Sequence, residues 1–277
     1  MEGLIFALTA SVFWGVNGIL LRIGFEEEDV FSSTMTVVFL SSLITFMAAA
    51  RDIGRAEVIP GNVLLLVTAG FISYFLGRLI TYRSIPIVGS SRAYSASSTR
   101  ILFSAILGVV VLGEEMNSLI LSGTVLMILG LYIFTTEEIN VREFYVSISS
   151  GLFFGLASML VKKGMLESVF LSLAISTFSG FVFLGIFCAL TGRFVLVRNR
   201  YILLSAATLT AGNILFYHAL KVSPLIIAIP LSNLYPIITT FIGFIAIREL
   251  EGINLKTVGA SVITVLGSVL ISAGYPG

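Results

Sequence analysis

Residues 77–114 read GRLITYRSIPIVGSSRAYSASSTRILFSAILGVVVLGE, and residues 212–249 read GNILFYHALKVSPLIIAIPLSNLYPIITTFIGFIAIRE. At this offset of 135 the matching positions are Gly77, Tyr82, Ala93, Ser97, Gly108 and Glu114 with Gly212, Tyr217, Ala228, Ser232, Gly243 and Glu249. Earlier segments repeat at an offset of 140, where Gly15, Arg22 and Gly24 fall on Gly155, Lys162 and Gly164. Chance similarity between Gly-, Ala- and Leu-rich helices is the alternative, but the matched Tyr and Glu positions argue against it. The chain is therefore predicted to consist of two related halves, 1–138 and 139–277.

The composition places these halves in a membrane. Of the 277 residues, 57% are apolar or aromatic and only 11% are charged, whereas an ordinary soluble domain carries about 25% charged residues. A soluble chain of this kind could not cover its surface with polar groups, which excludes a water-soluble enzyme or a secreted scaffold. The net charge of +1 offers no field to attract nucleic acid. The single cysteine, Cys188, excludes an internal disulfide or a thiolate metal site, and no cofactor or metal is expected.

Apolar runs bounded by charged residues predict ten transmembrane helices and no strands. Their lengths suit membrane helices, which need roughly 20 apolar residues. The first run follows Met1 and Glu2 without a basic region, so it is predicted to be a retained span and not a signal peptide. The predicted spans are 3–22, 30–50, 61–82, 87–112, 118–136, 144–163, 168–191, 201–220, 225–247 and 255–273.

Five spans in each half invert the second half across the membrane. Inverted repeats of this kind are a construction of secondary transporters, which bind substrate near the midplane between the repeats. The lipid bilayer and a small-molecule solute are therefore the expected partners. Small residues on the helix faces also permit a homodimer.

The repeated residues resemble the drug/metabolite transporter superfamily, EamA type. The resemblance rests on Trp14, Gly15 and Arg22 in the first span and on Phe154, Gly155 and Lys162 in its copy. It also rests on a proline, a glutamate and a Gly-rich helix: Pro236, Glu249, Gly259 and Gly267 in the second half. The first half has Glu114, Gly123 and Gly130, but Ile101 stands where the family has proline. The resemblance implies a ten-helix, multi-pass transporter of the cell membrane with both termini in the cytoplasm.

The charges in the connections favour the opposite orientation. The connections on the side away from the termini carry more Lys and Arg than those on the side of the termini, chiefly because of residues 193–200. The positive-inside rule would place that side in the cytoplasm. We keep the orientation that the resemblance implies as our prediction.

Arginines within the spans suggest what the chain binds. All fifteen carboxylates lie at span ends or in connections, whereas Arg78, Arg92 and Arg100 lie within spans. A charge at membrane depth costs at least about 2.5–3.5 kcal/mol on insertion scales and usually marks a functional site. Arginine can hold a carboxylate or phosphate with two hydrogen bonds. The alternative is that these arginines bind helix carbonyls, lipid headgroups or glutamates at span ends.

The repeat predicts where the substrate would bind. Polar residues occupy equivalent places in both halves, so a pseudo-two-fold axis would bring them to one cavity lined by the first, third, fourth, sixth, eighth and ninth spans. Arg100 and Arg92 are predicted to hold the anionic group, while Trp14 is either a cavity wall or a packing residue. The complete predicted site is Trp14, Asn17, Arg78, Tyr82, Arg92, Tyr94, Ser97, Arg100, Asn213, Tyr217, His218, Ser232, Asn233 and Tyr235.

Prolines suggest a gate in the ninth span. Pro230 and Pro236 remove helix hydrogen bonds and predict a bend there, either as part of a gate or as a static kink. The fourth span has no proline after Pro86, so it is predicted to bend differently. His218, the only histidine, is either a polar lining residue or a site of proton coupling.

These features predict a secondary transporter that moves a small organic solute bearing a carboxylate or phosphate by alternating access. The alternative is an exporter of neutral or zwitterionic amino acids or related metabolites. An intramembrane enzyme is disfavoured because the spans contain no carboxylate, no metal cluster and no suggestive Ser/His pair. A receptor or structural protein would need larger loops than the connections provide.

Overall fold

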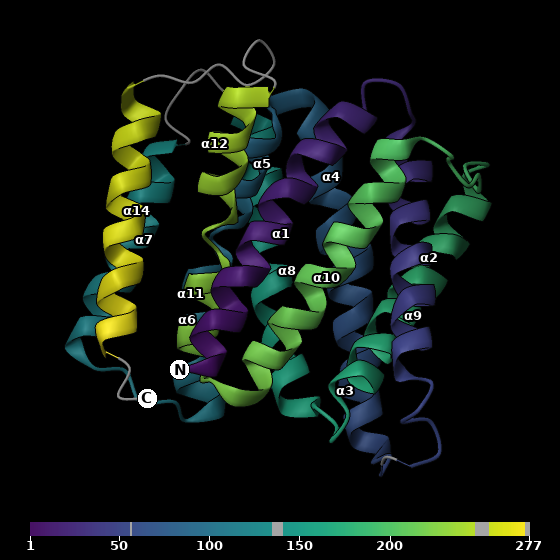
Figure 1. Cartoon of the computed structure of the whole chain (residues 1–277), viewed down its shortest axis with the longest axis horizontal. Helices are drawn as coiled ribbons and strands as arrows, with labels where there is room; N and C mark the ends of the chain where they lie inside the picture. The colour runs from purple at the N-terminus through teal and green to yellow at the C-terminus, as the bar shows by residue number, and fades with distance from the viewer. Residues whose placement is uncertain (56, 135–140, 247–254, 275–277) are drawn as a thin grey trace.

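The computed structural model describes residues 1–55, 57–134, 141–246 and 255–274, and the regular structure in these ranges is helical (Figure 1). The first half contains α1 (Glu2–Gly24), α2 (Val30–Ala49), α3 (Pro60–Gly70), the π-helix η1 (Phe71–Gly77), α4 (Arg78–Val88), α5 (Ser90–Ser97), α6 (Arg100–Leu112) and α7 (Ser118–Phe134). The second half contains α8 (Val141–Gly164), α9 (Val169–Leu190), α10 (Arg200–Val222), α11 (Leu225–Ser232), α12 (Tyr235–Ala246) and α14 (Leu255–Gly274).

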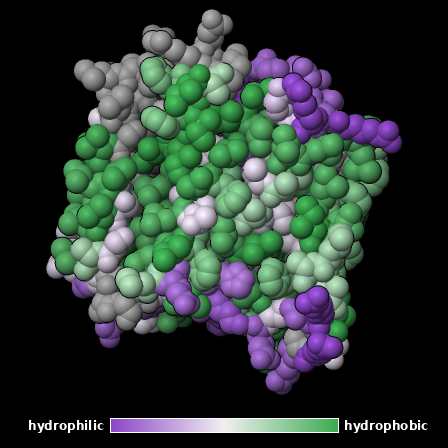
Figure 2. Space-filling model, viewed as in Figure 1, coloured by the Kyte–Doolittle hydropathy of each residue, from purple (hydrophilic) through white to green (hydrophobic). Residues whose placement is uncertain are grey.

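The predicted all-α membrane fold is confirmed. Seven helical stretches in the described residues are long and apolar enough to cross a membrane: α1, α2, α3 to α4, α5 to α6, α9, α10 and α11 to α12. Together with α7, α8 and α14 they account for ten spans. Figure 2 shows an apolar band across the molecule with hydrophilic residues towards its two ends, the surface that a bilayer requires.

The two halves interlock about a pseudo-two-fold axis. Helix α2 packs on its counterpart α9 at one edge of the molecule, and α7 packs on its counterpart α14 at the other (Figure 1). Helix α1 packs on α10, and equivalently α8 packs on α3 and η1. The start of α1 and the end of α14 lie at the same end of the molecule, here called the termini end.

Both the fourth and the ninth spans break at the same place in the repeat. Helix α5 ends at Ser97 and α6 begins at Arg100, while α11 ends at Ser232 and α12 begins at Tyr235. The fourth span, which is predicted to bend differently because it lacks a proline after Pro86, thus breaks at the residues equivalent to those of the ninth span, with the polar residues 98–99 between its two helices. The boundary between the third and fourth spans also differs from the prediction. The third span continues to Val88, and Gly89, with φ of 89°, makes the turn.

Two charged residues hold the turn between α10 and α11 at the termini end. Lys162 Nζ donates to the carbonyl oxygens of Leu220 and Ser223, at 2.8 and 2.7 Å. The Glu114 carboxylate accepts hydrogen bonds from the first two backbone amides of α11, at 2.6 and 2.9 Å. Each charge thus satisfies helix-end groups of the opposite polarity. The turn is thereby tied to the ends of α6 and α8.

Glycines allow α7 and α14 to cross at backbone contact. A Cβ atom on Gly267 would lie 2.6 Å from the carbonyl oxygen of Gly123 and 2.8 Å from the backbone nitrogen of Met127. Small residues of this kind commonly mark membrane helix pairs because dispersion contacts, and not hydrophobic burial, hold such helices together.

Candidate functional site

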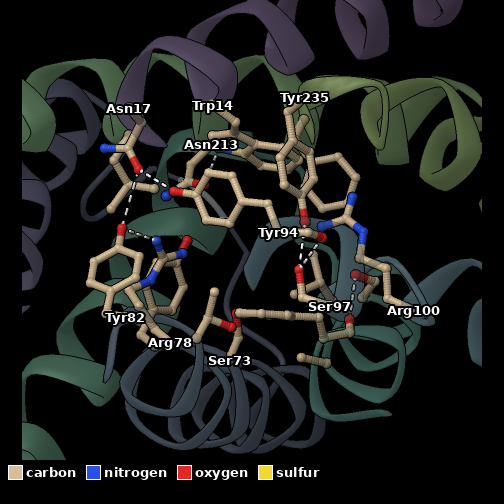
Figure 3. Close-up of a pocket in the computed structure, with 18 of the residues that line it drawn as sticks. Trp14, Asn17, Ser73, Arg78, Tyr82, Tyr94, Ser97, Arg100, Asn213 and Tyr235 are labelled. Carbon is tan, nitrogen blue, oxygen red and sulfur yellow. Dashed lines mark hydrogen bonds between the residues drawn. The ribbon is translucent and has the colours of Figure 1, made fainter. Parts of the chain in front are cut away.

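A cavity of about 70 Å³ lies between the two halves (Figure 3). It is lined by α1, η1, α4, α5 and α6 from the first half and by α8, α10 and α12 from the second. These helices belong to the six spans from which the sequence predicted a site. Ten of the predicted residues line it: Trp14, Asn17, Arg78, Tyr82, Tyr94, Ser97, Arg100, Asn213, Tyr217 and Tyr235. That they bind a substrate remains a prediction.

Two glycines that are equivalent in the repeat, Gly77 and Gly212, leave room for the aromatic rings that form two walls of the cavity. A Cβ on Gly212 would lie 2.6 Å from Trp14 Cδ1, and a Cβ on Gly77 would lie 3.1 Å from the ring of Phe154. Trp14 and Phe154 are equivalent in the repeat, as are the two glycines. The Trp14 indole nitrogen also donates to Asn213 Oδ1 at 3.1 Å. Trp14 is thus both a packing residue and a wall.

Arg78 is held on the cavity wall between two tyrosine rings. Its guanidinium carbon lies 5.0 Å from the ring centre of Tyr74 and 5.4 Å from that of Tyr82. Its Nη1 donates to the Tyr82 hydroxyl at 2.9 Å, while its buried Nε has no hydrogen-bond partner within the described residues. Only 8% of the side chain is exposed. The charge is therefore stabilised by π faces and one neutral oxygen.

Arg100 has a similar environment built largely from the second half. Its guanidinium carbon lies 5.1 Å from the Trp14 ring centre, 5.3 Å from that of Phe216 and 5.8 Å from that of Tyr235. Its Nη2 donates to Ser232 Oγ at 2.7 Å, and its Nε, like that of Arg78, has no partner in the described part of the chain. Arg100 is 5% exposed. A predicted site residue outside the lining, Ser232, thus positions Arg100.

Asn17 links the hydroxyl groups on one side of the cavity. Its Oδ1 accepts from the hydroxyls of Tyr82, at 3.3 Å, and Tyr94, at 3.0 Å, while its Nδ2 donates to the backbone oxygen of Ser205 at 2.8 Å (Figure 3). The Tyr235 hydroxyl lies 2.9 Å from Ser97 Oγ. This network fixes the rings that flank the arginines.

Three further predicted site residues, Arg92, His218 and Asn233, are not among the residues that line the cavity. Asn233 is buried in the break between α11 and α12, and neither polar atom of its side chain has a hydrogen-bond partner among the described residues. His218 packs between the rings of Phe6 and Phe170 in a separate surface pocket.

Arg92 is partly buried on α5 and is not among the lining residues. It lies two positions, about 200° of helix rotation, from the lining residue Tyr94. The structure therefore does not place Arg92 on the cavity lining with Arg100, and Arg78 is the second arginine on the lining. The proposed gate residues Pro230 and Pro236 are buried outside the lining, and their role remains a prediction.

Several residues of the lining are not among the predicted site residues, chiefly Tyr74, Phe154, Ser158 and Phe216. The spacing of Tyr74, Arg78 and Tyr82 at intervals of four could have identified Tyr74, because such residues share a helix face. The π-helix η1 carries Tyr74, and such insertions are frequent at functional sites. No comparable sequence signal predicts η1.

The charges that the described residues place on the cavity are all of one sign. In this part of the chain its lining contains Arg78 and Arg100 but no Asp or Glu. Within the described residues, the ion pair at salt-bridge distance joins Arg22 and Glu26, at 2.8 Å, and neither residue lines the cavity. No group of three His, Cys, Asp or Glu in the described ranges is placed to hold a metal ion.

Comparison with known proteins identifies the family of the chain. The model of the EamA-like transporter family matches residues 1–136 and 143–273. The chain belongs to the EamA-like transporter family. A relative from Archaeoglobus fulgidus, described as an uncharacterized transporter, is 24% identical over 98% of both chains. A crystal structure 12% identical in sequence superposes with a TM-score of 0.78 over 98% of this chain and 97% of the other, which shows the fold.

The resemblance noted in the sequence is thus confirmed. This EamA-like chain is a multi-pass membrane protein that transports small solutes. The family and the relative are both described as transporters, and neither is described as an enzyme.

Proposed function

We propose that the chain moves a small organic anion, bearing a carboxylate or phosphate, across the cell membrane. The observation that carries this proposal is the presence of Arg78 and Arg100 on one buried cavity, whose lining in the described residues contains no carboxylate. A buried charge normally requires a partner of opposite sign. A bound anion would supply that partner, and either guanidinium can accommodate it through charge-assisted hydrogen bonds.

We infer that transport proceeds by alternating access, with 1–138 and 139–277 as the two repeats and both termini in the cytoplasm. The cavity lies between inverted halves, and the paired breaks at 98–99 and 233–234 provide points at which its walls can bend. Pro230 and Pro236 would act in the gate beside the second break. The substrate would bind where both repeats contribute side chains, and rocking of one repeat against the other would expose it to each side in turn.

A competing proposal, export of zwitterionic amino acids, has less support. The substrate ammonium group would need a carboxylate or an unoccupied aromatic face. Among the described residues the lining has no carboxylate, and Arg78 and Arg100 already stack on five of its eight aromatic rings.

The first experiment is a ligand screen by thermal stability in detergent. The panel contains carboxylates, phosphorylated metabolites, amino acids, neutral sugars and lipophilic cations. A ligand that binds the folded protein raises its melting temperature by mass action. The buried thiol of Cys188 provides the readout, because a thiol-reactive fluorogenic dye labels it only on unfolding.

The decisive experiment measures uptake of the stabilising ligand into liposomes that contain only this protein. Arg100→Gln should weaken binding and uptake of the ligand by at least about tenfold, the scale of one lost charge-assisted contact, while the protein remains folded. Arg200→Gln is the matched control, because Arg200 is exposed at the start of α10 and stacks on Tyr201. Anion uptake by Arg100→Gln at wild-type affinity, or stabilisation by cations or neutral compounds alone, would overturn the proposal.

A further inference from the structure

The cavity presents two separate cationic positions. Arg78 comes from α4 and lies between Tyr74 and Tyr82 in the first half, whereas Arg100 comes from α6 and contacts rings of α1, α10 and α12. Figure 3 shows the two side chains apart from each other on the lining. The two guanidinium groups donate to different oxygens, those of Tyr82 and Ser232. Each guanidinium therefore has its own set of partners, and the two present separate binding groups on one cavity.

The described lining does not neutralise either charge. The oxygens bonded to Arg78 and Arg100 belong to a phenol and a hydroxyl, and each Nε lacks a hydrogen-bond partner in the described ranges. Two like charges on one buried cavity repel each other strongly because the local dielectric constant is low. A ligand with a single negative charge would leave one of them uncompensated, whereas a ligand with two would neutralise both.

The geometry limits where those two charges can be on the ligand. Because the guanidiniums are separate, each can bind its own planar carboxylate, the group that arginine recognises with paired hydrogen bonds. A phosphate monoester carries both charges on one group, so it does not present a separate anionic group to each arginine. A cavity of about 70 Å³ accommodates a short chain of atoms between the two groups.

We propose that the substrate is a short dicarboxylate, with one carboxylate on Arg78 and the other on Arg100. This inference rests on the proposed function, since it names the anion that the cavity would carry. Once one carboxylate is bound, the second binds at high effective concentration, provided that the chain between them matches the separation of the arginines. Affinity should therefore depend on chain length, with one optimum.

The test measures dissociation constants in detergent for malonate, succinate, glutarate and adipate. Butyrate serves as the four-carbon ligand with one carboxylate, 2-aminobutyrate as the zwitterion and glycerol 3-phosphate as the phosphate monoester. The best dicarboxylate should bind at least about tenfold more tightly than each of these, the scale of a charge-assisted contact. Uptake of that dicarboxylate into liposomes should show the same order of preference.

Single substitutions distinguish two binding groups from a structural role. In Arg78→Gln and in Arg100→Gln, the best dicarboxylate should fall to the affinity of butyrate, while butyrate itself changes less because the other arginine still holds it. A structural defect would weaken the binding of both ligands alike and would lower the melting temperature of the protein, as reported by labelling of Cys188. Arg200→Gln is the control for the substitution.

The results separate failure of this inference from failure of the proposed function. If butyrate or glycerol 3-phosphate binds as tightly as every dicarboxylate, and Arg100→Gln abolishes that binding, the anion site stands and the two-carboxylate inference is overturned. If no anion binds, or if 2-aminobutyrate binds best, both the inference and the proposed function are overturned.

Discussion

The crossing of α7 and α14 gives a sharp prediction, because two glycines of α14 have opposite surroundings. A Cβ on Gly267 would lie 2.6 Å from the carbonyl oxygen of Gly123 and 2.6 Å from Met127 Cγ. A Cβ on Gly259 would meet no atom of a neighbouring described segment within 4 Å. The same substitution to alanine therefore tests tertiary packing at one position and intrinsic helix propensity at the other.

The expected free-energy changes have opposite signs. In Gly267→Ala the helices must separate by several tenths of an ångström, because the contacted atoms include rigid backbone; such overpacking costs about 1–3 kcal/mol. In Gly259→Ala the helix gains up to about 1 kcal/mol from the better propensity of alanine. Gly267→Ala should therefore be less stable than Gly259→Ala by about 1–4 kcal/mol. At about 2–4 °C per kcal/mol for a chain of this size, the melting temperatures should differ by several degrees.

The assay is thermal unfolding in one detergent at one heating rate, reported by labelling of Cys188, which is buried and remote in sequence from both substitutions. Wild type should melt between the two variants or with Gly259→Ala. If Gly267→Ala melts at the same temperature as Gly259→Ala or higher, the close approach of α7 and α14 does not stabilise the fold and the reasoning is refuted.

Three further predictions concern the turn at the termini end and the cavity wall. Glu114→Gln should destabilise the protein by about 0.5–2 kcal/mol, because a neutral amide caps the first amides of α11 more weakly than a carboxylate; the same change at the next residue, an exposed glutamate, is the control. Lys162→Met should lower the melting temperature that Cys188 labelling reports, because two carbonyl oxygens at the end of α10 lose their donor. Lys163→Met changes an exposed side chain and should leave that temperature unchanged. Gly212→Ala should displace Trp14 and break its 3.1 Å hydrogen bond; since this is the single tryptophan, its fluorescence emission should shift, and an unchanged spectrum would contradict the contact.

Much of the fold could be predicted from the sequence because bilayer physics acts locally. A run of apolar residues must cross the membrane as a helix, since its backbone groups can be satisfied only within the segment. The repeat then specified which spans would meet, and the cavity lies between spans of both halves. The side-chain directions were harder to predict. Arg78 and Arg92 both lie in polar stretches of the sequence, but only Arg78 lines the cavity.

A helical membrane protein with two inverted halves, and with cations but no carboxylates inside its spans, can be predicted from composition, periodicity and the internal repeat. That Arg78 and Arg100 share a cavity, that η1 brings Tyr74 to its wall, and that Glu114 caps a helix of the other half became clear from the three-dimensional arrangement. Such contacts depend on helix rotation and crossing, which are set by close packing between residues far apart in the chain.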